Sequence, residues 1–382
     1  MKWPTKEAEV AVLCSRIKMS SEHIEQVLEL ISNSDFNWVD FLDHMMHHRL
    51  SGLIAKNIGK VPSIPVGISK ILTQLAALNS EKGRLFISET EELFRIFKKQ
   101  KLKVILFKGP RLVKDIYPEY SLRTFGDLDI LISPKDYPEV KRILNSFGYE
   151  QGELINYEFV KMSDAVLDHI ENNLQHYGTF IRKGESAALP WLHIDVHTRF
   201  TTSYDSISYN TDRVIDEAVA TQIGSTDVFI LNDTDHIIHL CLHLYWHTRS
   251  IMNIEINDDL QLIRFVDIFE SINQLEIDWD KLLKIVKEEK GLQQAVAYTL
   301  FLTEKIYGNI IPTKVREEFW NDDINRHLDS ISERWLNESD SVLGYWNIPF
   351  EERMFNKERV NEAYRIFYEY ARNAKRREIR KL

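Results

Sequence analysis

The sequence is poor in cysteine. Its 382 residues include only two, Cys14 and Cys241. Two thiols this far apart along the chain are too few for a disulfide framework or for a zinc site made of cysteines. We therefore expect a protein of the reducing cytoplasm.

The sequence also lacks the segments that carry proteins to or across a membrane. Its first seven residues do not combine a basic start with an apolar stretch, as a secretory signal does. The most apolar later stretch, 237–246, contains histidine and falls far short of the roughly 20 residues that a spanning helix needs. We expect neither export nor a membrane anchor.

An excess of positive charge is missing as well. The chain has 48 Lys and Arg against 58 Asp and Glu, which gives a formal net charge of -10. Such a chain repels polyanions except where basic side chains gather, so a long nucleic-acid footprint is not expected. One basic cluster lies at the C-terminal end and consists of Arg372, Lys375, Arg376, Arg377, Arg380 and Lys381. It is interpreted either as a solvated helix end or as a local binding site for RNA or for an acidic partner.

The apolar content of 44% is enough for a large core, and the length exceeds that of a usual single domain. The periodicity of apolar residues divides the chain into three parts. We predict an α+β protein with a helical N-terminal region (1–100), a small mixed-sheet core (101–205) and a helical C-terminal region (206–382).

The predicted core begins with strand, tight turn and helix. Residues 102–107 favour a strand, and Lys108-Gly109-Pro110 ends it before helical spacing resumes. A second strand is predicted at 128–132, followed by a helix over 137–147 that Asp136 caps and Gly148 ends. Two further strands are predicted at 175–182 and 191–200, joined by a turn at 183–186.

The later part of the chain returns to helical spacing. Pro312 interrupts the array, and a last amphipathic helix is predicted from about Asn356 to the end. The other helices are predicted at 235–246, 258–269, 280–290 and 293–307.

A pair of carboxylates opens the second strand. Asp127 and Asp129 stand two residues apart, so on a strand both side chains point to the same face. Asp195 lies inside the later strand between two apolar residues, Ile194 and Val196. If the strands are neighbours, three mutually repelling carboxylates meet, and a hard divalent cation such as Mg²⁺ relieves the repulsion. The alternative interpretation of Asp127 and Asp129 is a solvated strand end.

Several of these motifs occur in the same order in a known family. The chain resembles the uncharacterised bacterial nucleotidyltransferases of the DNA polymerase beta-like superfamily, and the resemblance spans roughly residues 20–310. It rests mainly on the runs 107–112 (FKGPRL), 122–132 (LRTFGDLDILI), 147–149 (FGY) and 194–197 (IDVH).

The resemblance implies a catalytic role for the three carboxylates. Asp127, Asp129 and Asp195 would bind Mg²⁺, or Mn²⁺ in its place, and Asp195 would also orient or deprotonate the acceptor. Gly109 would let phosphates approach the backbone. The superfamily usually has a small residue after this glycine, often Ser, whereas this chain has Pro110.

Phosphate binding is therefore expected from basic side chains near the carboxylates, namely Lys108, Arg111 and Arg123, with His197 as a further nucleotide-binding residue. For Arg123 the alternative is a structural ion pair with one of the aspartates. His193 and His197 flank Asp195 on the same strand face, where they can tune the site.

A second group of histidines occurs at helical spacing: His236, His239, His243 and His247. Three interpretations stay open. The histidines pack in the core or support the residues of a neighbouring active site, they contact the substrate, or they bind zinc. The metalloprotease pattern is incomplete because no Glu follows the first His.

The expected function is transfer of a nucleoside monophosphate from a nucleoside triphosphate, with ATP as the expected donor, to a peptide, protein, metabolite or tRNA acceptor, with release of pyrophosphate. One alternative is a toxin-type enzyme that modifies tRNA. Others are a catalytically silent nucleotide-binding or scaffold protein and, as the weakest, a histidine-based metal hydrolase.

Overall fold

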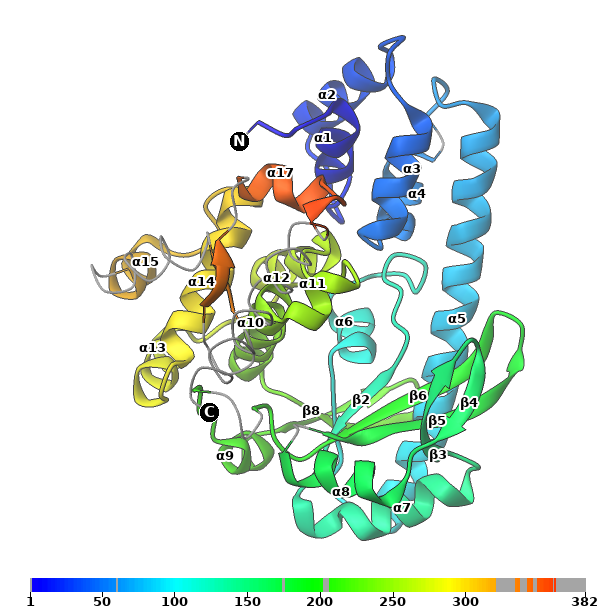
Figure 1. The fold of residues 1–382 in the computed structure, drawn as a ribbon, viewed down its shortest axis with the longest axis vertical. Coiled ribbons are helices and arrows are strands. Elements are labelled where there is room, and N and C mark those ends of the chain that lie inside the picture. The colour runs from blue at the N-terminus through cyan, green and yellow to red at the C-terminus, as the bar shows by residue number, and fades with distance from the viewer. Residues whose placement is uncertain are drawn as a thin grey trace, which may run out of the picture.

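The computed structural model describes residues 2–59, 61–173, 176–201, 206–320, 334–336, 342–345, 349–359 and 361. In this part of the chain, helices surround one eight-stranded mixed sheet (Figure 1). A separate two-stranded sheet is formed by β9 (Arg334–Leu336) and β10 (Val342–Tyr345). The α+β class predicted from the sequence is confirmed.

The described part of the N-terminal region is helical. Its last helix, α5, has 34 residues and extends from beside the other N-terminal helices to the sheet (Figure 1). The five helices are α1 (Lys6–Leu13), α2 (Ser21–Ile31), α3 (Trp38–His47), α4 (Ser51–Ile58) and α5 (Val66–Lys99).

The large sheet combines parallel and antiparallel pairs in the order β4-β3-β5-β6-β2-β1-β8-β7. The pairs β2–β6 and β1–β8 are parallel, and the other pairs are antiparallel. The strands are β1 (Ile105–Phe107), β2 (Leu128–Leu131), β3 (Glu150–Ile155), β4 (Glu158–Lys161), β5 (His176–Ser186), β6 (Leu189–His197), β7 (Val219–Ile223) and β8 (Thr226–Ile230).

The β5–β6 hairpin differs from its prediction at the turn. β5 continues through Ser186, so residues 183–186 belong to the strand, and the register shifts between Lys183 and Ser186. A Cβ on Gly184 would lie 1.9 Å from the Leu189 carbonyl oxygen. The glycine therefore permits a close approach of two backbones inside the hairpin, whereas the sequence suggested a turn.

The sheet also extends past the predicted end of the core. β7 and β8 form a hairpin after residue 205, and β8 pairs with β1. The core boundary expected at residue 205 therefore cuts through the sheet. In the sequence, a strand as short as 226–230 looks like a loop between helices. Only its pairing with β1 identifies it as a strand.

The helices of the core lie between the strands in sequence. Asp136 precedes α7 as predicted, but its side chain accepts no capping hydrogen bond. The chain enters α7 directly from the short 3-10 helix η1. The elements are α6 (Gly109–Asp115), η1 (Pro134–Asp136), α7 (Tyr137–Ser146) and α8 (Asp164–Asn173).

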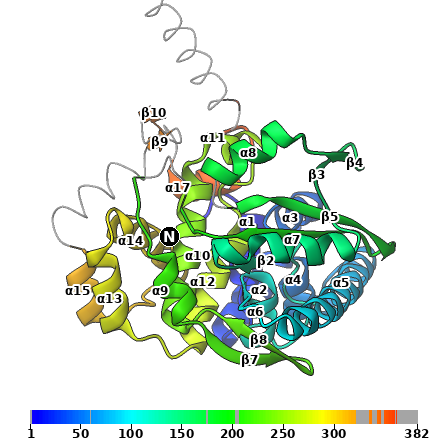
Figure 2. The same ribbon diagram turned by 90° about the horizontal axis from the view of Figure 1, so that it is seen from below.

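The two faces of the sheet have different partners. One face carries Leu128, Ile130, Ile194 and Val196, which pack into one apolar core with side chains of α5 and α7. Figure 2 shows α7 lying along this part of the sheet. Since side chains alternate along a strand, Asp129 and Asp195 point to the other face, toward the C-terminal helices.

The described C-terminal helices are α9 (Thr211–Asp216), α10 (Asp233–Arg249), α11 (Ile251–Glu255), α12 (Leu262–Gln274), α13 (Trp279–Glu288), α14 (Leu292–Tyr307), α15 (Thr313–Phe319) and α17 (Phe350–Phe355). Helices α10, α12, α13 and α14 correspond to predicted helices with shifted ends; α12, for example, begins at Leu262 and not at Asp258. The others were not predicted, and Pro312 directly precedes α15.

The predicted last helix lies almost entirely outside the described residues, as does the basic cluster at 372–381. Of the helices that the structure describes, none has both the length and the apolar character that crossing a membrane demands.

Candidate active site

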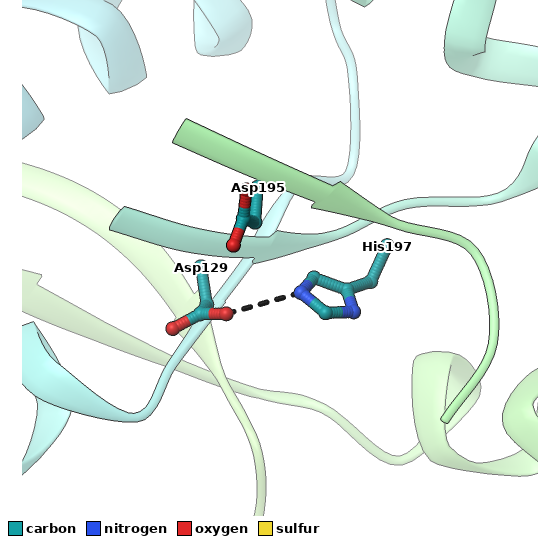
Figure 3. A group of neighbouring side chains, drawn as sticks. All are labelled: Asp129, Asp195 and His197. Atoms are coloured by element: carbon teal, nitrogen blue, oxygen red, sulfur yellow. Dashed lines mark hydrogen bonds and ion pairs between the residues drawn. The ribbon is translucent and has the colours of Figure 1, made fainter. Parts of the chain in front are cut away.

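Two carboxylates meet on adjacent parallel strands. Asp129 on β2 and Asp195 on β6 are register partners, and Figure 3 shows both side chains on the same side of the sheet. The Thr179 hydroxyl on β5 donates a hydrogen bond of 2.7 Å to Asp195 Oδ1. The register therefore brings together two acidic residues that are distant in sequence, as the sequence analysis expected.

His197 completes a group with metal-binding geometry. Asp129, Asp195 and His197 each offer one ligand atom, and these atoms lie within 4.8 Å of one another. The His197 Nε2 atom lies 3.0 Å from Asp129 Oδ1 (Figure 3). Two carboxylate oxygens suit Mg²⁺ or Mn²⁺, and an imidazole nitrogen is a better ligand for Mn²⁺ than for Mg²⁺.

Asp127 lies next to this group without being part of it. It precedes β2, is half-buried, and lines the same cavity as Asp129 and Asp195. Burial and the charges of Asp129 and Asp195 raise the pKa of Asp127 to about 7. The three carboxylates repel one another when they are ionised, and a bound divalent cation would remove this repulsion. The residues present therefore fit such an ion.

Lys108 also reaches the carboxylates. Its Nζ atom donates a 2.6 Å hydrogen bond to Asp129 Oδ1, and its side chain is largely buried. Burial alone would lower the Lys108 pKa, but Asp129 and the other two site carboxylates outweigh burial and raise it. Lys108 therefore remains charged and offsets part of the negative charge.

The backbone of Lys108 is strained. Its φ of 52° and ψ of -124° belong to a conformation that glycine adopts far more readily than lysine. Such a conformation costs on the order of 1–3 kcal/mol and is typical of functional sites. This positive φ lies at the residue directly before Gly109.

Gly109 is required for packing. A Cβ at this position would lie 2.8 Å from both Cβ and Cγ of Phe125, which is closer than side chains approach each other. Gly109 also lines the cavity. Its small size lets α6 lie against the loop that leads into Asp127.

The carboxylates open into a cavity of about 490 Å³ between the sheet and the C-terminal helices. One wall carries the three site aspartates, and another carries arginines. The charged and histidine side chains that line the cavity are Arg49, Lys108, Arg123, Asp127, Asp129, His193, Asp195, His243, His247, Asp258, Arg264 and Asp267.

Arg123 lines the cavity but is bound by a different aspartate from those considered in the sequence analysis. Its Nε and Nη2 atoms donate hydrogen bonds of 3.0 Å and 2.8 Å to the two carboxylate oxygens of Asp267 on α12. The Tyr117 hydroxyl donates a 2.7 Å hydrogen bond to the same carboxylate. Asp267 therefore holds Arg123 in a fixed orientation.

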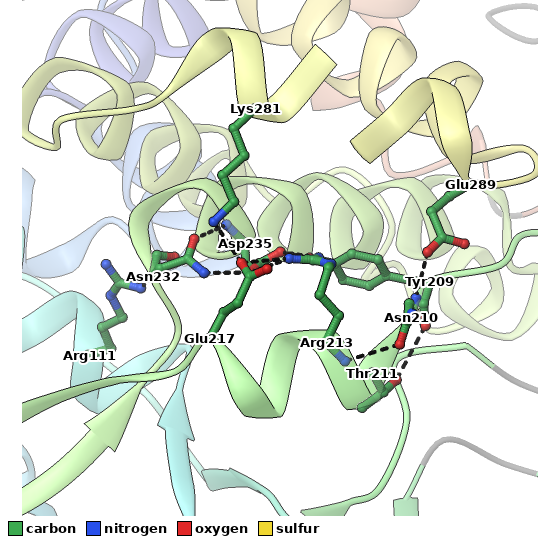
Figure 4. Close-up of polar contacts among 10 residues, drawn as sticks. All are labelled: Arg111, Tyr209, Asn210, Thr211, Arg213, Glu217, Asn232, Asp235, Lys281 and Glu289. Atoms are coloured by element: carbon green, nitrogen blue, oxygen red, sulfur yellow. Dashed lines mark hydrogen bonds and ion pairs between the residues drawn. The ribbon is translucent and has the colours of Figure 1, made fainter. Parts of the chain in front are cut away.

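Arg111 does not belong to the cavity lining. Its side chain is 1% exposed, and its Nη2 atom donates a 2.5 Å hydrogen bond to Asp233 Oδ1. Nη1 donates to the carbonyl oxygens of Leu231 and Asn232, and Figure 4 shows Arg111 beside Asn232. Arg111 thus joins α6 to the start of α10, and we omit it from the phosphate-binding residues.

The start of α10 is fixed by a second buried carboxylate. Asp235 is fully buried and accepts hydrogen bonds from Arg213 (2.6 Å) and from the Tyr209 hydroxyl (2.6 Å). Lys281 on α13 donates a 2.6 Å hydrogen bond to Glu217, which itself pairs with Arg213. Figure 4 shows this network between α9, α10 and α13, where it positions the helix that covers the cavity.

The histidines of α10 divide into two pairs. His236 and His239 are buried in the core, where burial lowers the pKa of each well below its ordinary value. His243 and His247 line the cavity with their Nε2 atoms 3.2 Å apart. Among the described residues, the group with metal-binding geometry contains none of these four histidines, so zinc on α10 gains no support.

Four charged cavity residues were not singled out by sequence reasoning. Arg49 comes from the loop between α3 and α4, Asp258 from the loop before α12, and Arg264 and Asp267 from α12. They lie in sequence regions with ordinary helical composition. Their place in the cavity depends on tertiary contacts, so no local sequence pattern marks them.

Comparison with known proteins agrees with this geometry. A family model described as an uncharacterised nucleotidyltransferase matches residues 34–308, which is more than half of the chain. The matched range covers the sheet, the three aspartates, the arginines of the cavity and the helix α10. No curated protein matches the chain.

Proposed function

Because the chain belongs to the uncharacterised nucleotidyltransferase family, we propose that it transfers a nucleoside monophosphate from a nucleoside triphosphate to an acceptor and releases pyrophosphate. ATP is the proposed donor, and a peptide, protein or small metabolite is the proposed acceptor. The observation that carries the proposal is the register of Asp129 with Asp195 beside Lys108 at a cavity of about 490 Å³.

The proposed reaction is a substitution at the α-phosphorus. An acceptor oxygen forms a bond to this phosphorus while the bond to the oxygen that bridges the α- and β-phosphates breaks, and pyrophosphate leaves with the bonding electron pair. If the acceptor is a hydroxyl, its proton passes to Asp195. The acceptor retains the nucleoside monophosphate.

The divalent cation of this proposal is Mg²⁺, or Mn²⁺ in its place, held by Asp127, Asp129 and Asp195. When bound, it would neutralise phosphate charge and make the acceptor oxygen a better nucleophile. His197 orients Asp129 through its Nε2 atom, and the Thr179 hydroxyl orients Asp195. Such partners fix the direction of a ligating carboxylate.

Lys108 has two roles in the proposal. It donates a hydrogen bond to Asp129, and its ammonium group can move to a phosphate oxygen when a bound cation satisfies the carboxylate. Arg123 supplies a second positive charge whose orientation Asp267 fixes. Both side chains line the cavity in which the triphosphate would lie.

A transfer assay tests the proposal. Purified protein is incubated with Mg²⁺, cell extract and ATP labelled either at the α- or at the γ-phosphate. The native chain should transfer the α-label alone, and Asp127→Asn with Asp129→Asn should lose the transfer. Asp227→Asn on the exposed part of β8 is the matched charge-removing control and should retain it.

The identity of the labelled product separates the remaining alternatives. Nuclease-sensitive label would identify the tRNA-modifying alternative, and protease-sensitive label a peptide or protein acceptor. Absence of transfer by the native chain, together with nucleotide binding, would favour a silent nucleotide-binding protein. Equal transfer by the native and double-variant chains would refute the carboxylate assignment.

A further inference from the structure

The wall of the cavity that carries Arg49, Arg123 and Arg264 has more cations than carboxylates. Asp267 binds Arg123 through both of its oxygens. Asp258 accepts a 2.7 Å hydrogen bond from Arg264 Nη2, and its backbone carbonyl accepts one of 2.6 Å from Arg264 Nη1. Each of these two carboxylates therefore has an arginine that it binds closely.

Arg49 is bound less closely. Its Nη2 atom lies 3.4 Å from Asp258 Oδ1, and its side chain is 48% exposed. The same carboxylate also has the His247 Nδ1 atom 3.3 Å away. Asp258 thus already binds Arg264 and lies close to His247. Moving the Arg49 guanidinium from Asp258 to an anion in the cavity therefore costs little free energy.

The backbone of Arg49 allows its side chain to be removed without strain. Arg49 has a φ of 57° and ends α3, where Leu50 N donates to Met45 O (2.9 Å) and Arg49 N to Met46 O (3.2 Å). This pair of hydrogen bonds defines a helix-ending motif in which glycine is preferred. A residue with a Cβ costs about 1–2 kcal/mol in this conformation. The fold alone would therefore favour glycine over arginine at position 49.

We infer that Arg49, with Arg264 beside it, binds phosphate oxygens of the nucleoside triphosphate beyond the α-phosphate. This inference rests on the proposed function. A guanidinium pairs with phosphate through two parallel hydrogen bonds, which is stronger than its single long contact with Asp258. The N-terminal helices would thereby supply a residue to a site that is otherwise built by the sheet and the C-terminal helices.

Arg49→Gly tests the inference without endangering the fold. Since the backbone at position 49 favours glycine, this variant should melt no lower than the native protein. With Mg²⁺, its dissociation constants for ATP and for inorganic tripolyphosphate should increase at least tenfold, whereas that for AMP should not change. Arg49→Lys should lie between the two proteins.

Lys101→Gly is a matched control. Lys101 is a cation with a φ of 56°, and it ends α5 through the same pair of hydrogen bonds, from Leu102 N to Phe97 O and from Lys101 N to Lys98 O (both 3.0 Å). It lines a different surface pocket, between the end of α5 and the β7–β8 hairpin. Its replacement should leave binding of all three ligands unchanged.

The outcomes separate this inference from the proposed function. If the native protein binds neither ATP nor tripolyphosphate in the presence of Mg²⁺, the proposed function fails. If the native protein binds both and Arg49→Gly binds them equally well, the role of Arg49 is overturned while the proposed function stands. An equal loss of affinity for ATP and AMP would also overturn it, because a contact beyond the α-phosphate cannot affect AMP.

Discussion

Asp129 and Asp195 lie opposite each other in the parallel β2–β6 pair, with the first fully buried and the second half-buried. Two ionised carboxylates at neighbouring register positions repel each other, and the protein compensates through Lys108, His197 and Thr179. The repulsion between these carboxylates can be tested by measuring how divalent cations, pH and substitutions change the stability of the folded protein.

Divalent cations should stabilise the folded protein. A ligand that binds only the native state at a hundred times its dissociation constant adds about 2.7 kcal/mol. We expect Mg²⁺ or Mn²⁺ to raise the melting temperature, measured by differential scanning calorimetry after removal of metal with a chelator. Asp129→Asn should abolish this increase, and Asp227→Asn should preserve it. An increase that survives in Asp129→Asn would place the ions elsewhere.

The stability of the metal-free protein should fall as the pH rises from about 4 to about 7. The pKa of Asp127 is raised from 3.8 to about 7 in the folded protein, so between these values the folded state binds a proton that the unfolded state has lost. Raising the pH removes that proton and leaves the folded state with an added repulsion. Urea unfolding at several pH values with a chelator present measures the effect. Asp127→Asn should flatten this part of the profile.

Gly109→Ala should destabilise the protein by about 1–3 kcal/mol and reduce transfer. The added methyl group would meet Phe125 at 2.8 Å, so α6 and the loop before Asp127 must separate. Phe125→Leu combined with Gly109→Ala should recover part of the stability, since a smaller side chain makes room. Unfolding in urea compares the native protein with the two variants, and native-like stability of Gly109→Ala would show that the contact relaxes freely.

Asp235→Ala should cost about 1–3 kcal/mol, because it leaves the buried Tyr209 hydroxyl and one edge of the Arg213 guanidinium without their hydrogen-bond acceptor. Lys281→Met removes a more exposed ion pair in the same network and should cost no more than about 1 kcal/mol. Thermal unfolding provides the comparison. A similar small loss in both variants would mean that the position of α10 depends on apolar packing alone.

Sequence reasoning located the carboxylates because their pattern is local. Asp127 and Asp129 lie at the start of an apolar strand, and Asp195 lies inside another, so the strand period fixes the face of each. The predicted strands and helices were mostly found near the predicted positions for the same reason. The hairpin of β7 and β8 was missed because short strands gain their identity from the strand they pair with.

The cations of the site were harder to predict. Lys108, Arg111 and Arg123 looked equivalent in sequence, yet Lys108 contacts Asp129, Arg123 is held by Asp267, and Arg111 is buried against the start of α10. A long side chain can reach in several directions from the same backbone position. Its direction depends on carboxylates and carbonyls contributed by distant parts of the chain.

The sequence by itself determined the α+β class, the family motifs and the three carboxylates, because apolar periodicity and strand alternation act over a few residues. Only the tertiary structure decided which cations share the cavity with those carboxylates, and it added Arg49 from the end of α3 and Arg264 from α12. The reason is physical: ion pairs and cavities form between segments that the chain brings together on folding, and their energies depend on distance and burial in space.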